Sequence, residues 1–350
     1  MTIQDALTDV RGMRVGHAQR AGDGWLTGTT VVLAPEDGAV AGVDSRGGAP
    51  GTRETDALDP RNVVERIHSV VLTGGSAFGL DSAAGVMSWL EEQGRGVRVG
   101  ADPAQVVPVV PAAVLFDLGR GGRWRARPDA ALGREAAEAA ARTEPGALVV
   151  QGNAGAGTGA VVGGLKGGIG SASALLSSGV TVGVLAAVNA AGSALDPATG
   201  ALYGEQWDGP PPPLPEGRVH AEALRRLAAA QEETASRSAG VLRPPFNTTL
   251  AVIATDAALT RAQAQKLAGT AHDGLARSLR PVHLMHDGDT VFTLATGERP
   301  LEGEQLNDLL AAGADVLTRA VVKAVLAAEG VDGPGGVFPS YRDLYGRRGG

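Results

Sequence analysis

The feature of this chain that most restricts its fold is an alternation of short apolar runs with longer helical patterns. The stretch "RIHSVVLTGGSAFGLDSAAGVMSWLEEQG" (66–94) shows the unit: an apolar run, a Gly-Gly turn, and a helix from about Ser76 to Glu92. Further β-rich runs predict strands at 29–35, 146–151, 179–192 (ending near Asn189) and 290–296. Further helical patterns occupy 220–237, 260–279 and 304–330. This alternation predicts a layered α/β or α+β protein.

The core has to be built from small side chains. Aromatic residues make up only 3% of the chain, whereas 52 of its 350 residues are glycine. Alanine, valine and leucine must therefore fill the interior, and the backbones of neighbouring elements must pack closely together. A chain of this length can bury a sizeable core.

Charge and residue content exclude several classes of function. The net charge of −7 argues against nucleic acid or an anionic membrane as a partner. The absence of cysteine excludes thiol catalysis, disulfides and cysteine-ligated zinc. The N-terminal segment has neither the basic nor the apolar region of a secretory signal, and no apolar run reaches the ~18 residues of a membrane span. We therefore expect a cytoplasmic protein.

The chain is predicted to form one domain over residues 1–350, because it contains neither an internal repeat nor a convincing domain boundary. Residues 194–217 are loop-like, and their "DGPPPPLPEG" is too rich in proline for a regular element. Together with the helix at 220–237, this loop makes residues 194–246 an insertion within the domain.

A polar triplet, Asn247, Thr248 and Thr249, stands between "RPPF" and the apolar "LAVIATD". The simplest interpretation is a threonine that opens a strand. The triplet also matches a glycosylation sequon, which the lack of a signal segment disfavours. The third interpretation is a self-cleaving N-terminal nucleophile: the Thr248 hydroxyl attacks the Asn247 carbonyl, and the freed amine, with a reference pKa of about 8, then serves as a general base.

Lys166 is the only charged residue in the glycine-rich stretch "QGNAGAGTGAVVGGLKGGIGSAS" (151–173). The stretch has neither the dinucleotide-binding glycine spacing nor the Gly-Lys-Ser/Thr sequence of a phosphate loop. Tight turns and close backbone packing account for its glycines. A lysine enclosed by such a backbone loses its proton readily, because burial disfavours the charged form, and this makes Lys166 a candidate functional residue.

Two further polar groups stand beside predicted strands. "HLMHDGDTVF" (283–292) carries Asp287 and Asp289, which lie on one side of an extended segment and could orient an amine or a hydroxyl. A polar turn and a metal site are the alternatives there. Asn189 stands among alanines at a strand end, where a buried amide must be hydrogen-bonded and could serve as an oxyanion donor.

Five separated motifs give the chain a resemblance to a known family. In chain order they are "VDSRGGAPGTRETDALDP", "LTGGSAFGLDSAAGVMSWLEE", "VVPAAVLFDL", "KGGIGSAS" and "FNTTLAVIATDAALT". Together they resemble the DmpA-like family of self-processing aminopeptidases and amidases, which includes β-peptidyl aminopeptidases and nylon-oligomer hydrolases. The resemblance extends from Val15 to about Thr296. It implies a four-layer α/β/β/α sandwich, and oligomers of a two-chain unit that are often tetramers or larger.

The resemblance also implies roles for individual residues. Thr248 matches the family's nucleophile, so the chain would be cut into 1–247 and 248–350, and the Asn-Thr junction resembles the nylon-oligomer hydrolase branch. The other matching positions are Lys166 (catalytic lysine), Asn189 (oxyanion asparagine), and Asp287 with Asp289 (the paired aspartates near the nucleophile's amine).

The expected activity is hydrolysis of amide bonds in small peptides or ω-amino-acid amides and oligomers, without a cofactor. Three alternatives stay open. The protein could be a strict aminopeptidase that removes small N-terminal residues, an acyltransferase resembling ornithine acetyltransferase, or a binding protein that has kept the fold.

Overall fold

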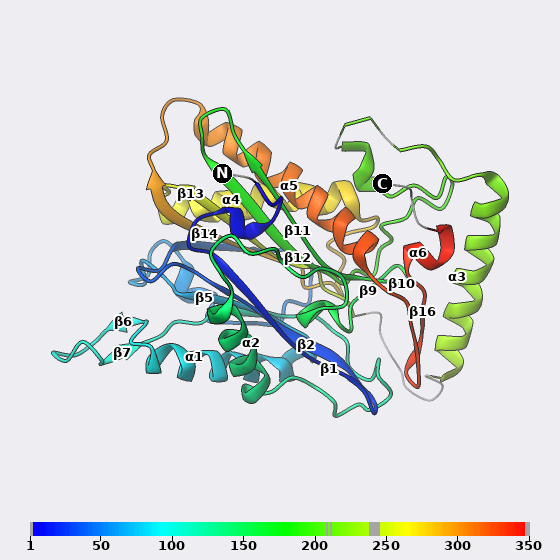
Figure 1. Cartoon of the computed structure of the whole chain (residues 1–350), viewed down its shortest axis with the longest axis horizontal. Coiled ribbons are helices and arrows are strands. Elements are labelled where there is room, and N and C mark those ends of the chain that lie inside the picture. The colour runs from blue at the N-terminus through cyan, green and yellow to red at the C-terminus, as the bar shows by residue number, and fades with distance from the viewer. Residues whose placement is uncertain (1–2, 208, 211, 238–245, 347–350) are drawn as a thin grey trace.

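Two β-sheets stacked face to face, each covered by a pair of helices, make up the body of the protein (Figure 1). The structure is a computed structural model, and it describes residues 3–207, 209–210, 212–237 and 246–346. The layers follow one another as helices, sheet, sheet, helices, so the expected four-layer α/β/β/α sandwich is confirmed.

The first sheet has the strand order β1-β2-β5-β8-β4. Its strands are β1 (Arg14–Gly22), β2 (Trp25–Leu33), β5 (Ser69–Thr73), β8 (Ala112–Val114) and β4 (Thr52–Arg53). Helices α1 (Ser82–Glu92) and α2 (Ala130–Arg142) cover its outer face, where alanine, valine and leucine side chains form one apolar cluster.

The second sheet has the strand order β11-β12-β13-β14-β3. Its strands are β11 (Gly168–Leu175), β12 (Thr181–Val188), β13 (Leu250–Ala257), β14 (Thr290–Arg299) and β3 (Val40–Ser45). Helices α4 (Arg261–Ser278) and α5 (Gln305–Ala327) cover its outer face. Within this sheet only β13 and β14 run parallel to each other, and the other neighbouring pairs are antiparallel.

Smaller elements surround the sandwich. Helix α3 (Gly217–Arg237) lies beside α6 (Tyr341–Tyr345) at one end of the molecule, outside the four layers (Figure 1). The short strands pair as β6 (Val97–Arg98) with β7 (Val106–Val107), β9 (Val161–Val162) with β10 (Leu165–Lys166), and β15 (Val331–Gly333) with β16 (Gly336–Phe338). Five short 3-10 turns are η1 (Leu7–Asp9), η2 (Asp56–Leu58), η3 (Ser76–Asp81), η4 (Gly155–Gly157) and η5 (Tyr203–Trp207).

Glycine lets the helices lie directly on the strands, as the composition predicts. A Cβ atom on Gly170 of β11 would lie 1.9 Å from the Ala320 carbonyl oxygen of α5. A Cβ atom on Gly16 of β1 would lie 2.1 Å from the backbone nitrogen of Ala140 in α2. Both are shorter than any real contact, so larger residues there would push the layers apart.

The sequence predicts some of these elements but misses the strands β1, β3, β4, β8 and β11. The strands expected at 29–35, 179–192 and 290–296 and the helices expected at 220–237, 260–279 and 304–330 are present with shifted ends. The strand expected at 146–151 is wrong: the run forms no strand, and the nearest β-pairing is an isolated bridge from Gly152, just after it, to Ile169 of β11.

The helix expected from Ser76 begins instead as the 3-10 turn η3, and α1 starts at Ser82. Gly75 and Ser76 both have positive φ, so the chain leaves β5 through a left-handed turn before it can become helical. Helix α2 is an element that the sequence analysis did not predict.

The insertion expected at 194–246 contains η5 and α3, and its residues 208, 211 and 238–245 lie outside the described part of the chain. Among the described residues, no helix is both long and apolar enough to cross a membrane.

Candidate active site

Three strand ends meet at one edge of the second sheet and bring the polar motifs together. Ala187 of β12 pairs with Leu250 of β13, so Asn189, just past the end of β12, lies beside the start of β13. Leu250 also pairs in parallel with Thr290 of β14, which places Asp289 at the same edge. The strand β14 therefore runs beside β13, the strand that follows Thr248.

Thr248 is buried at this edge and is held on three sides. Its backbone N–H donates to the Asn189 carbonyl oxygen at 2.7 Å. Its hydroxyl donates to the carbonyl oxygen of Asn247 at 2.6 Å and accepts from the Gly288 N–H at 3.1 Å. The hydroxyl therefore lies against the peptide group that self-cleavage would break.

Asn189 is fully buried, and its amide has a defined orientation. Its Oδ1 accepts hydrogen bonds from the Val161 N–H at 3.0 Å and from the Arg120 guanidinium. Its Nδ2 donates to the Phe116 carbonyl at 3.4 Å. Because two donors hold Oδ1, the orientation of the amide is fixed with Nδ2 toward Phe116, and the role of oxyanion donor stays a prediction.

Arg120 joins the two asparagines of the site. Its Nη1 donates to the Gly159 carbonyl at 2.6 Å and to Asn189, while its Nη2 donates to Oδ1 of Asn247 at 2.9 Å. The loop after β8 carries Arg120, so this contact links the first sheet to the edge of the second. The guanidinium therefore fixes both the residue before Thr248 and the candidate oxyanion donor.

Lys166 is completely buried, as the sequence predicts. Its Nζ donates to the main-chain carbonyls of Gly157 at 2.8 Å and Gly167 at 2.7 Å. Burial, reinforced by the positive charge of Arg120 and opposed by the nearby Asp117, lowers the pKa of Lys166 to about 7. Among the described residues both hydrogen bonds of Nζ go to main-chain carbonyls and none goes to Thr248, so a proton-transfer role at Thr248 stays a prediction.

Asp117 is a second buried titratable group next to this lysine. Its Oδ1 accepts from the Gly75 N–H at 2.7 Å. Burial raises the pKa of Asp117 to about 6, although the positive charge of Arg120 opposes this change. Asp117 and Lys166, both buried, and the half-buried Arg120 therefore form a cluster of charged groups, in which the charge of Arg120 acts on the pKa of both other residues.

The low pKa of Lys166 predicts how stability changes with pH. Between about 7 and its ordinary value of 10.5, the unfolded chain carries a proton on Lys166 that the folded chain lacks, so raising the pH through this window stabilises the fold. The cost of burying the lysine is on the order of a few kcal/mol below pH 7 and disappears near pH 10.

We therefore expect Lys166→Met to be more stable than the wild type at pH 7, with a difference that shrinks as the pH approaches 10. Urea unfolding across this range measures it. Lys266→Met, at an exposed position of α4, is the control. A stability difference for Lys166→Met that does not change with pH would contradict the prediction.

The two aspartates have different partners, and of the two it is the Asp289 side chain that holds the backbone beside the nucleophile. Oδ1 of Asp289 accepts from the Thr249 N–H at 2.7 Å, and its Oδ2 lies 2.8 Å from Nδ1 of His283. Oδ2 of Asp287 accepts from the Leu284 N–H at 2.9 Å, whereas its buried Oδ1 has no hydrogen-bond partner among the described residues. Burial, reinforced by the negative charge of Asp289, raises the pKa of Asp287.

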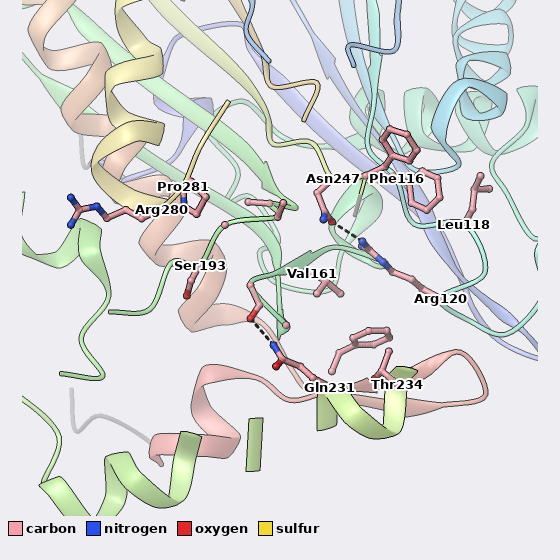
Figure 2. Close-up of a pocket in the computed structure, with 17 residues that line it drawn as sticks. Phe116, Leu118, Arg120, Val161, Ser193, Gln231, Thr234, Asn247, Arg280 and Pro281 are labelled. Atoms are coloured by element: carbon pink, nitrogen blue, oxygen red, sulfur yellow. Dashed lines mark hydrogen bonds between the residues drawn. The ribbon is translucent and has the colours of Figure 1, made fainter. Parts of the chain in front are cut away.

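A cavity of about 550 Å³ opens beside Asn247 (Figure 2). Aromatic and aliphatic side chains form much of its wall, and none of the described residues that line it is acidic. Arg120 and Asn247 point toward each other within it, whereas the guanidinium of Arg280 points away from it. The cavity is therefore lined by both apolar and polar groups, with one inward-facing cation next to the Asn247–Thr248 bond.

Sequence reasoning missed Arg120, Asp117 and the Gly288 N–H as parts of this site. The available signal was "FDLGRGGRW", in which polar residues directly follow an apolar run and which begins at the end of the family motif "VVPAAVLFDL". Metal binding, the alternative raised for the segment 283–292, receives no support. Across residues 3–346, apart from the gaps at 208, 211 and 238–245, no three His, Asp or Glu side chains are placed to hold a metal ion.

The model of "Peptidase family S58" matches residues 5–338, nearly the whole chain. The chain belongs to peptidase family S58. Membership of a peptidase family confirms the expectation that the protein is an enzyme that cleaves amide bonds.

Curated relatives agree with this assignment. An uncharacterized aminopeptidase of Mycobacterium tuberculosis is 48% identical over 97% of this chain and 98% of its own length. An uncharacterized aminopeptidase of Mycobacterium leprae is 44% identical over 97% of this chain and 94% of its own. A 6-aminohexanoate-oligomer endohydrolase of Kocuria sp. is 32% identical over 83% of this chain and 74% of its own. The mycobacterial proteins are thus more similar to this chain than that nylon-oligomer hydrolase, although the Asn-Thr junction suggested its branch.

Solved structures show the same fold. The L-aminopeptidase D-Ala-esterase/amidase of Ochrobactrum anthropi, described as a variant of the Ntn hydrolase fold, has a TM-score of 0.71 at 20% identity, covering 98% of this chain and 94% of its own. A Burkholderia sp. beta-aminopeptidase has a TM-score of 0.70 at 24% identity, covering 99% and 95%. The fold of this S58 protein is therefore the DmpA-like Ntn hydrolase fold.

Proposed function

We propose that this S58 protein is an N-terminal threonine hydrolase that first cuts its own Asn247–Thr248 bond and then cleaves small amides. The observation that carries the proposal is the hydroxyl of buried Thr248 at 2.6 Å from the Asn247 carbonyl oxygen. The resulting unit would be one domain made of two chains, 1–247 and 248–350.

Self-cleavage follows from this geometry as an acyl shift. The Thr248 oxygen attacks the Asn247 carbonyl carbon while a base accepts the hydroxyl proton. The carbon–nitrogen bond then breaks, and the nitrogen takes up a proton to become the Thr248 amine. Water hydrolyses the remaining ester, which leaves a carboxylate on Asn247 and restores the hydroxyl.

Substrate turnover repeats the same steps with an external amide. The Thr248 hydroxyl attacks the substrate carbonyl, and either its own amine or Lys166 accepts the proton. A pKa of about 7 suits Lys166 to this exchange near neutral pH. The Asn189 amide stabilises the oxyanion, the leaving amine takes the proton, and water then hydrolyses the acyl ester.

The two aspartates have different environments, and we therefore propose different roles for them. Asp289 already accepts from the Thr249 N–H and contacts His283, so it fixes the start of β13. Asp287 has a buried oxygen without a partner among the described residues, and its backbone forms an isolated β-bridge with Asn247. We propose that this oxygen orients the Thr248 ammonium, whose pKa it raises.

Asp287→Asn is expected to lower amide turnover by at least ~100-fold, because it removes the charge that positions the new amine. Asp289→Asn should have the smaller effect on turnover, since an asparagine oxygen can still accept from the Thr249 N–H. Steady-state kinetics across pH, with processing measured separately by mass, tests this. If both variants turn over substrate like the wild type, the pair is only a structural turn.

An amide panel tests the function as a whole. Dipeptides, aminoacyl amides and 6-aminohexanoate oligomers should distinguish a strict aminopeptidase, which needs a free N-terminal amine, from a broader amidase. Adding amine acceptors tests the acyltransferase alternative, because a transferase would give the acylated amine in place of the free acid. Turnover of none of these amides by the cut protein would contradict the proposal.

We also propose that the two-chain unit assembles into a homo-oligomer, a tetramer or larger, as the family resemblance implies. Light scattering on the purified protein measures this directly.

A further inference from the structure

We infer that Arg120 selects substrates whose acyl group carries a carboxylate or an amide, at the length of an aspartyl or asparaginyl side chain. This inference rests on the proposed function, because it assumes that a substrate binds in the place that the uncut Asn247–Thr248 peptide occupies. Self-cleavage and turnover share the nucleophile and the oxyanion donor, so both carbonyl groups must occupy the same place. The groups attached to the Asn247 carbonyl then mark where the acyl part of a substrate lies.

The side chain of Asn247 marks the position of the substrate's acyl side chain. Its Oδ1 accepts from Nη2 of Arg120 at 2.9 Å, inside the cavity of about 550 Å³ (Figure 2). Nη1 of the same guanidinium stays bound to Gly159 and Asn189, which belong to the fold. The arginine is therefore held in place, and its contact with residue 247 becomes a contact with substrate when Asn247 withdraws after the cut.

The main chain of Asn247 marks the position of a substrate amine. Its N–H donates to the His286 carbonyl oxygen at 3.4 Å, and it pairs in a parallel bridge with Asp287. An α-ammonium at this position would donate to the same carbonyl. The substrate that fits this site therefore has an N-terminal residue whose amine lies toward His286 and whose side chain lies toward Arg120.

The charge of the cavity decides which side chains fit best. Arg120 is the cation that faces inward, and Asp117, the carboxylate whose pKa its charge lowers, is not part of the described lining. A carboxylate forms a charge-assisted hydrogen bond with a guanidinium, an amide forms a neutral one, and an aliphatic side chain leaves the guanidinium N–H facing apolar atoms. A lysine side chain would place two cations together. The expected order is therefore aspartyl, asparaginyl, leucyl, lysyl.

The test is a set of aminoacyl p-nitroanilides with aspartyl, asparaginyl, leucyl and lysyl groups, assayed with the cut wild-type protein. We expect kcat/KM for the aspartyl substrate to exceed that for the leucyl substrate by ~10- to 100-fold, the range for a hydrogen bond to a charged group. Arg120→Met should lose the preference for the aspartyl over the leucyl substrate. Its overall rates could also fall, because Asn189 loses its hydrogen bond from Arg120. Arg123→Met, on the same loop but outside the cavity lining, should keep the ratio.

A second measurement does not depend on external substrates. Asn247→Asp should process at least as fast as the wild type, whereas Asn247→Leu and Asn247→Lys should process more slowly, in that order. Equal turnover of leucyl and aspartyl substrates, or fast processing of Asn247→Lys, would overturn the role of Arg120 and leave the proposed hydrolase intact. Absence of both processing and turnover in the wild type would instead refute the proposed function, and this inference with it.

Discussion

Thr248→Ala is expected to remain one full-length chain of 350 residues, while the wild type separates into 1–247 and 248–350 under denaturing conditions. The substitution removes the hydroxyl oxygen that lies against the Asn247 carbonyl as an attacking group. It leaves the backbone N–H bond to Asn189 in place, so the strand start should keep its position. Intact mass measurement after incubation at neutral pH reads the result directly, and amide hydrolysis should be lost together with processing.

Two control variants separate the lost hydroxyl from damage to the fold. Thr248→Ser keeps an attacking oxygen and should still cut, though at a changed rate. Thr249→Ala changes the neighbouring threonine, whose buried hydroxyl has no hydrogen-bond partner among the described residues, and should also cut. A wild type that stays whole after prolonged incubation, or a Thr248→Ala protein that still cuts at this bond, would refute the self-cleavage mechanism.

Lys166→Met is expected to lower both processing and turnover by ~100-fold or more, the range for losing a positioned proton-transfer group. Methionine fills a similar volume, so the buried space between Gly157 and Gly167 stays occupied. In the wild type, kcat/KM should rise with pH through about 7, as Lys166 loses its proton and becomes able to accept one. In Lys166→Met this rise should disappear.

Lys266→Met, at an exposed position of α4, is the matched control and should behave like the wild type. If Lys166→Met keeps full activity with an unchanged pH profile, the Thr248 amine acts alone as the base. If it loses activity but keeps the pH dependence, the lysine positions the site without exchanging the proton.

Much of the fold follows from local pattern. The apolar runs at 179–192 and 290–296 could be assigned as strands because β-branched residues cluster there, and both form central strands of the second sheet. The run at 146–151 has a similar composition but gains no neighbouring strand. A strand needs a partner at the right distance, and a local pattern does not contain that information.

The candidate site, too, could be predicted from the sequence only in part. Thr248, Lys166, Asn189, Asp287 and Asp289 stand in recognisable motifs, so the sequence by itself determined the family and nominated these five residues as candidates for the site. What the tertiary structure alone decided is how these groups are partnered. Arg120 reaches Asn189 and Asn247 across 69 and 127 residues of chain, because the loop after β8 packs against the edge of the other sheet. Hydrogen bonds and burial act between groups that are close in space, so they set the lysine pKa, the oxyanion geometry and the charge of the cavity only once the two sheets have packed.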